Sequence, residues 1–135
     1  MAIADGGELL ILAPGIQQFG EDPQHDAFIR KYGYIGRQNV LDMLKANEEM
    51  QNNMGAAAHL IHGSSDGRFK ITYAVKNISK EEIASVNFIP ADYDETVKIY
   101  DPTKLKFGYN VMPDGEEIYF IPNPALGLWV SKDKL

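Results

Sequence analysis

A short, continuously apolar segment near the start of the sequence does most to restrict the fold. Residues 8–13 (ELLILA) follow two glycines and precede Pro14 and Gly15. An apolar run of this length between turn residues predicts a strand that is buried on both faces, as in a parallel sheet. Pro14 has no N–H to donate to a neighbouring strand, so the strand is expected to end there.

Strand patterns and helix patterns alternate along the remaining chain. Strands are predicted at residues 8–13, 69–75, 88–89 and 117–121. Helices are predicted at residues 25–31, 37–50, 54–62, 80–87 and 96–100. The alanine-rich helix is expected to end at Gly63, and Ser79 with Glu82 forms a capping box that starts the next helix. This alternation predicts an α/β fold with a mixed, partly parallel sheet flanked by helices.

Composition narrows the class of protein. A chain of 135 residues has the usual size of one domain, so a single domain over residues 1–135 is expected. The absence of cysteine excludes disulfides, thiolate zinc sites and cysteine nucleophiles, and it fits a cytoplasmic protein. A net charge of −6 argues against a nucleic-acid partner. No apolar run approaches the roughly 20 residues of a membrane-spanning helix, so no membrane partner is expected.

Two histidines are the first candidates for a functional site. His59 and His62 lie three residues apart in a predicted helix, where they would share one face. There they could ligate one metal ion or contact one substrate, but a third ligand and the glutamate of the zinc-protease motif are both missing. No metal site is therefore predicted, and stabilisation of the helix C-terminus remains the structural alternative.

Further candidates lie in loops and at a helix start. Arg37 could bind a carboxylate through two hydrogen bonds, although a solvated arginine is the simpler interpretation. The turn at residues 63–67 (GSSDG) could offer N–H groups to an anion, or could be only a turn. In a parallel sheet, ligands sit beyond the carboxyl ends of the strands, which points to the loops after Ala13 and Val75. No pair of nucleophile and base is visible, so no catalytic residue is predicted. Near the end of the chain, the aromatic residues are expected to serve packing: Tyr109, Tyr119, Phe120 and Trp129.

Five segments carry a family resemblance, both in their residues and in their order along the chain. They are residues 4–14 (ADGGELLILAP), 34–37 (YIGR), 55–63 (GAAAHLIHG), 70–75 (KITYAV) and 114–121 (DGEEIYFI). Together they resemble the C-terminal domain of the nickel-dependent lactate racemase family, and most of all its branch of sugar-acid epimerases. The resemblance covers nearly the whole chain, although each motif is short.

The resemblance implies one half of a two-domain isomerase that inverts the hydroxyl-bearing carbon of a 2-hydroxy acid. In that family a nickel-pincer nucleotide removes a hydride and returns it, and histidines act as acid and base on the hydroxyl. These groups belong to an N-terminal domain that this chain lacks. The chain is therefore expected to carry no cofactor, to be inactive alone, and to have that domain and a small hydroxy acid as partners. His59, His62 and Arg37 are carried over as substrate-binding residues.

One departure from the family bears on the substrate. Lactate racemases place a tryptophan before the helix that corresponds to residues 54–62, where this chain has residues 51–54 (QNNM). A polar wall there would suit a more hydroxylated acid than lactate. Two alternatives remain open: a stand-alone module that binds a small molecule or a protein without catalysis, and a small metal-dependent hydrolase built on His59 and His62.

Overall fold

A computed structural model describes residues 2–126, which divide into two compact units. The larger unit holds residues 3–93, and the smaller holds residues 94–126 together with Ala2. Each unit is described by itself below. The single domain expected over residues 1–135 stays a prediction, and the packing role expected of Trp129 lies outside the described residues.

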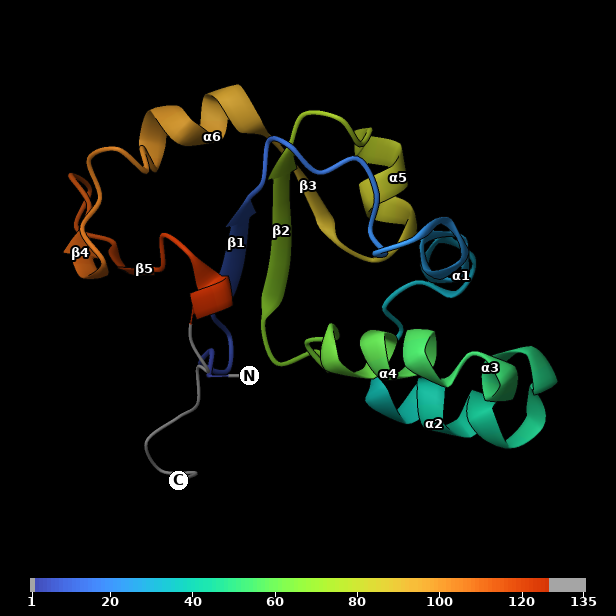
Figure 1. Cartoon of the computed structure of the whole chain (residues 1–135). Helices are drawn as coiled ribbons and strands as arrows, with labels where there is room; N and C mark the ends of the chain where they lie inside the picture. The colour runs from blue at the N-terminus through green and yellow to red at the C-terminus, as the bar shows by residue number, and fades with distance from the viewer. Residues whose placement is uncertain (1, 127–135) are drawn as a thin grey trace. The chain divides into compact units, whose positions relative to one another are not determined.

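The larger unit is built around a parallel sheet. Its strands are β1 (Glu8–Leu12), β2 (Lys70–Val75) and β3 (Ile89–Asp92), in the order β1-β2-β3. Glu8 pairs with Lys70 at one end of β1, and Leu12 pairs with Ala74 at the other. The same two strands run in one direction in Figure 1. The predicted α/β class is confirmed, with helices flanking a sheet whose three strands are all parallel.

Five helices occupy the connections between these strands. They are α1 (Pro23–Tyr32), α2 (Arg37–Ala46), α3 (Glu48–Asn52), α4 (Met54–His62) and α5 (Lys80–Ser85). The prediction of one helix over residues 37–50 is wrong, because the chain leaves the helix at Asn47. Asn47 is extended, and its side-chain oxygen accepts from the Met50 N–H at 3.1 Å, so it caps the start of α3. A short polar side chain that bonds to nearby backbone competes with a continuous helix.

The core of the larger unit lies between its helices and one face of the sheet. Its most completely buried side chains are Ile29, Val40, Met50, Leu60, Ile83 and Val86. The expectation that residues 8–13 form a strand buried on both faces is wrong, since Glu8 is exposed and the other residues of β1 are only half-buried. The central strand β2 has that buried character instead.

A carboxylate anchors the loop that connects β1 to α1. Asp26 Oδ1 accepts from the Phe19 N–H at 2.6 Å, and its Oδ2 accepts from Arg30 Nε at 2.6 Å. Arg30 also donates from Nη1 to Glu82 Oε1 at 2.6 Å. Glu82 belongs to the predicted capping box, which the structure confirms at the start of α5. One arginine therefore links the loop, α1 and α5.

The capping box makes part of the stability dependent on pH. Hydrogen bonds from the Ser79 N–H and from Arg30 lower the pKa of Glu82 to about 2. A carboxylate with a lowered pKa in the folded state stabilises the fold above its ordinary pKa and loses this contribution as the pH falls towards 2. Glu82→Gln is expected to remove that part of the acid dependence. Urea unfolding between pH 2 and pH 6 measures it, and identical slopes for the variant and the parent protein would contradict the expectation.

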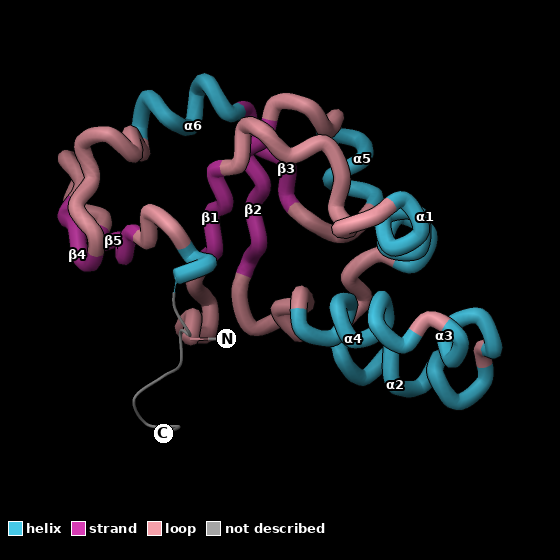
Figure 2. Tube along the Cα trace, viewed as in Figure 1, coloured by secondary structure: helices cyan, strands magenta, loops and turns pink. Residues whose placement is uncertain are grey.

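The smaller unit contains a short helix and a hairpin. The division between the units falls near the start of α6 (Tyr93–Ile99). Strands β4 (Gly108–Val111) and β5 (Glu117–Phe120) then pair antiparallel. The 3₁₀ helix η1 (Pro124–Leu126) follows them. Figure 2 shows these elements coloured by type. The packing role expected of Tyr109 is wrong, because 84% of that residue is exposed and its ring meets Tyr119 edge-on.

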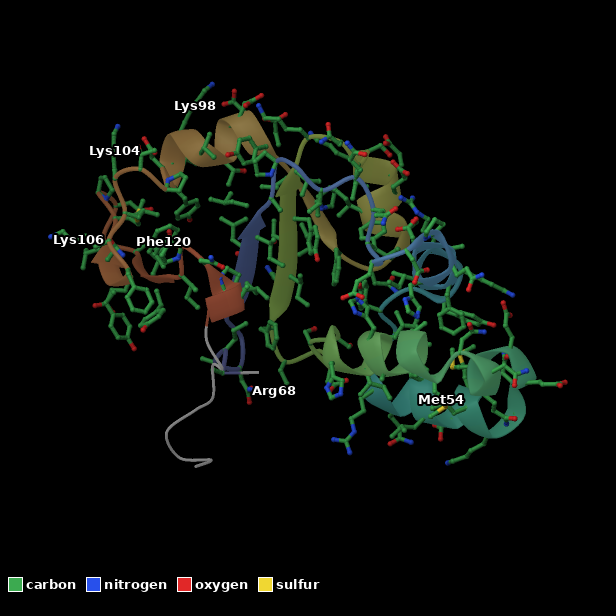
Figure 3. All side chains as sticks on the ribbon, viewed as in Figure 1. Met54, Arg68, Lys98, Lys104, Lys106 and Phe120 are labelled. Atoms are coloured by element: carbon green, nitrogen blue, oxygen red, sulfur yellow. The ribbon has the colours of Figure 1, made fainter. Side chains whose placement is uncertain are left out.

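Two surface properties complete the description. Lys98, Lys104 and Lys106 extend outward from the smaller unit (Figure 3). Among residues 2–126, no helix combines the length and the apolar character needed to cross a membrane.

Candidate functional site

The two histidines predicted as substrate-binding residues lie on α4. The predicted helix is confirmed over Met54–His62, and it ends at Gly63, whose N–H donates to the His59 carbonyl at 2.8 Å. His59 and His62 are three residues apart on this helix, so their imidazoles project from one face. Both residues are exposed, which leaves them available for a ligand.

A buried tyrosine holds one of these histidines. Tyr34 Oη lies 2.8 Å from His59 Nε2. The Tyr34 ring stacks on Phe88 at a centroid distance of 4.2 Å. The backbone of Gly63 approaches the ring so closely that a Cβ atom there would lie only 2.6 Å from it. Tyr34 is 8% exposed, and burial strongly raises the pKa of its hydroxyl. The hydroxyl therefore stays protonated and fixed in position.

The third histidine of the chain joins this neighbourhood, although no sequence argument selected it. His25 lies on α1, with Nδ1 3.0 Å from Asp22 Oδ2, and a Cβ atom at Gly55 of α4 would lie 3.5 Å from its Nε2. The pKa of His59 is lowered, first by partial burial and then by the nearby imidazoles of His25 and His62, against the opposing charge of Glu21. The sequence signal that could have located His25 is Asp22-Pro23, because Asp22 caps the helix, Pro23 begins it and His25 therefore lies in its first turn.

Arg37 lies in a different feature, an open hollow of about 750 Å³. The hollow is lined by three segments of the chain: residues 34–39, residues 64–67 and Asn87. Arg37 is exposed, and the structure gives its guanidinium no ion pair with any of the residues it describes. Hydroxyl and amide side chains make up half of the remaining lining: Gln38, Asn39, Ser64, Ser65 and Asn87. The hollow therefore offers polar groups and the Arg37 guanidinium to a small polar ligand, and the carboxylate of Asp66 also belongs to its lining.

Asp66 belongs to the turn at residues 63–67, which the sequence offered as a possible anion-binding turn. Its Oδ1 accepts from the Arg37 N–H at 2.6 Å, at the start of α2, where Gly36 has no side chain to cap the helix. A carboxylate at this end of a helix interacts favourably with the helix dipole. The start of α2 is thus already satisfied by the protein, and the charge left for a ligand is that of the Arg37 side chain.

Backbone strain is concentrated around this hollow. Asp66 and Asn87 have φ angles of 53° and 67°, and among the described residues they are the non-glycine residues with positive φ. Both line the hollow. Aspartate and asparagine adopt this conformation more readily than other residues, but it still costs energy that the surroundings must supply.

The hollow lies towards the amino ends of β2 and β3. A smaller cavity of about 110 Å³ shares Tyr34, Ser64, Ser65 and Asn87 with it and reaches Lys70 and Ile89, the first residues of those strands. The loops after Ala13 and Val75 meet at the opposite end of the sheet, where Asn77 Nδ2 donates to the Pro14 carbonyl at 3.1 Å. The hollow that contains Arg37 thus lies away from the end of the sheet that topology suggested.

Tyr34 connects the separate parts of the prediction. It lines the hollow that contains Arg37, and it bonds to His59 on α4. The structure does not place His59 or His62 among the residues that line the hollow. Sequence reasoning missed Tyr34, although the segment YIGR had already drawn attention to this position.

Comparison with known proteins gives one informative similarity. No protein-family model matches the chain, and no curated protein matches it. Among solved structures, the chain is similar to a crystal structure of a protein from Thermotoga maritima, with 28% sequence identity and a TM-score of 0.53. The similarity covers 77% of this chain and 24% of that protein. The chain thus spans about a quarter of the length of the Thermotoga protein, and the likeness supports the α/β fold.

Proposed function

We propose that this chain is the substrate-contacting part of a larger 2-hydroxy-acid racemase or epimerase whose reacting centre lies on another domain. Two findings support this proposal. Five sequence segments follow the order of the C-terminal domain of nickel-dependent lactate racemases, and a structurally similar protein is about four times as long as the matched region. We propose a cytoplasmic enzyme whose partners are that domain and a small acid.

The observation that carries the proposal is that Tyr34 lines the hollow that contains Arg37 and also bonds to His59. The Arg37 guanidinium can bind a carboxylate through two parallel hydrogen bonds. His59 offers an uncharged imidazole, because its lowered pKa keeps it neutral near pH 7. A 2-hydroxy acid presents a carboxylate and a hydroxyl on adjacent carbons. One cation and one neutral hydrogen-bonding group on neighbouring elements are the chemistry that such a ligand requires.

The nickel-pincer nucleotide of the proposed enzyme would be held outside the described residues. Nickel requires several nitrogen, sulfur or oxygen ligands. No three His, Cys, Asp or Glu side chains come together as a metal site within residues 2–126. Hydride removal and return is the chemistry that this cofactor would supply in the complete enzyme. The role proposed for this chain is to bind the carboxylate and orient the hydroxyl.

Removal of the Arg37 guanidinium is expected to weaken binding of hydroxy acids. Gluconate and L-lactate should bind the whole chain with a Kd in the range of about 1 mM, since one wall of a site makes few contacts. Arg37→Ala should weaken this binding about tenfold, because a charge-assisted pair of hydrogen bonds is lost. Isothermal titration calorimetry and chemical-shift perturbation in NMR spectra measure both effects.

Lys45→Ala is the matched control for this substitution. Lys45 is also an exposed cation of α2, but it pairs with Asp42 and does not line the hollow. Its removal should leave the affinity unchanged. Glycerol, which has no carboxylate, should not bind, and propionate, which has no hydroxyl, should bind more weakly than lactate. No binding of either hydroxy acid at tens of millimolar would contradict the proposal, and tight binding of an unrelated ligand would favour the stand-alone module.

A further inference from the structure

The hydroxyl of Tyr34 is a well-packed group beside an exposed imidazole. Phe88 stacks on one side of the Tyr34 ring, Tyr73 stacks on Phe88 at 4.7 Å, and the backbone of Gly63 approaches the ring closely. His59 is an exposed residue with a single side-chain hydrogen bond to the described residues, the one to Tyr34. The tyrosine therefore determines how the histidine is oriented.

The burial of Tyr34 favours one direction for this hydrogen bond. Tyr34 Oη has one hydrogen-bonding partner among the described residues, His59 Nε2 at 2.8 Å. If the hydroxyl accepted the hydrogen bond from Nε2, its own O–H would have no acceptor among the described residues, which is costly for a largely buried group. If the hydroxyl donates, Nε2 is the acceptor, and both groups are satisfied. In a neutral imidazole, the proton then lies on Nδ1.

We propose that Tyr34 is a positioning residue that holds His59 in the Nδ1-protonated form, so that His59 donates a hydrogen bond to an oxygen of the bound acid. This inference rests on the proposed function for its ligand, and on the Tyr34–His59 distance for its geometry. His59 Nδ1 forms no hydrogen bond with any residue in the described part of the chain, so its proton is available. The histidine acts as a donor to substrate and not as a base, because its other nitrogen is already occupied.

The charges around His59 favour the same state. His25 and His62 disfavour a further positive charge on the imidazole, Glu21 favours one, and partial burial is the largest influence against it. His59 therefore remains neutral near pH 7 and becomes doubly protonated only in more acidic solution. Protonation of Nε2 would oppose the O–H of Tyr34 and break the arrangement.

The test begins with the parent protein and needs no substitution. Long-range ¹H–¹⁵N NMR spectra of the whole chain distinguish a protonated Nδ1 from a protonated Nε2 for each histidine. We expect His59 to be protonated on Nδ1 at pH 7.5. A spectrum that shows the proton of His59 on Nε2 overturns the inference and leaves the proposed function standing.

A hydroxyl-deleting variant then tests the dependence on Tyr34. Tyr34→Phe keeps the stacked ring and removes the donor, so His59 should lose its preference for the Nδ1 form and its pKa should rise, because the donated hydrogen bond stabilises the neutral imidazole. Tyr32→Phe is the matched control, because the Tyr32 hydroxyl bonds to Glu49 instead. Equal behaviour of His59 in the two variants overturns the inference.

Gluconate and lactate separate this inference from the proposed function. Both acids should shift the His59 Nδ1–H resonance in the parent protein, and Tyr34→Phe should weaken their binding about threefold to tenfold. Binding that shifts resonances of the Arg37 hollow but leaves His59 unchanged overturns the role of Tyr34 alone. An absence of binding anywhere on the chain overturns the proposed function and this role together, even if His59 is protonated on Nδ1.

Discussion

Leu60→Ala is expected to lower the free energy of unfolding by about 3 kcal/mol. Leu60 lies on α4 with none of its surface exposed, and it belongs to the core cluster of the larger unit. Truncation of a buried leucine removes apolar contacts and leaves a cavity that the surroundings fill only in part, which costs roughly 2–5 kcal/mol. Urea unfolding followed by circular dichroism measures the loss.

Met54→Ala is the matched control on the same helix. Met54 is 58% exposed at the first position of α4, and it too loses most of its side chain in the substitution. Its effect should stay within about 0.5 kcal/mol, since exposed side chains contribute little to stability. Equal losses for the two variants would show that α4 is not packed as the structure has it. Because His59 directly precedes Leu60, Leu60→Ala should also loosen the imidazole bonded to Tyr34.

Gly20→Ala is expected to destabilise the fold by roughly 2–3 kcal/mol, the range of a forced overpacking. A Cβ atom at Gly20 would lie 2.5 Å from the Asp26 nitrogen and 2.7 Å from the His25 carbonyl carbon. Both are backbone atoms of α1, so no side-chain rotation relieves the clash. The loop would have to move, and the bond from the Phe19 N–H to Asp26 would be lost with it.

Gly15→Ala provides the comparison in the same loop. A Cβ atom at Gly15 would meet nothing within 4 Å. This substitution should therefore change the free energy of unfolding by no more than about 0.5 kcal/mol. Thermal and urea unfolding of the two variants under one buffer condition compare them directly. A Gly20→Ala protein as stable as Gly15→Ala would contradict the close approach of this loop to α1.

The sequence was most informative where a local signal determines local structure. The capping box at Ser79 and the end of α4 at Gly63 were predicted correctly, because a side chain or a backbone bond within a few residues fixes each one. The break at Asn47 was missed, since the periodic pattern of apolar residues continues through it. Strand β4 was missed as well, because half-buried and exposed residues alternate along it and it buries little apolar surface.

The candidate site was predicted only in part, because it depends on contacts between distant segments. Histidine spacing gave the shared face of His59 and His62 without reference to the fold. Nothing in the sequence links Tyr34 to His59, or Asp66 to the start of α2, since each contact joins residues about 25 or more positions apart. The topological rule pointed to the opposite end of the sheet because it considers strand order and no side chains.

The pairing of β1 with β2 has a consequence for the order in which the protein forms during synthesis. Glu8 pairs with Lys70, and α1 to α4 lie between them in the sequence. The first strand therefore leaves the ribosome long before its partner exists, and the sheet cannot nucleate until residue 75 has emerged. Contacts between residues so distant in sequence slow folding, whereas helices form locally and early. The apolar segment ELLIL stays unpaired during this interval, and an unpaired apolar strand is the kind of segment that aggregates in a growing chain.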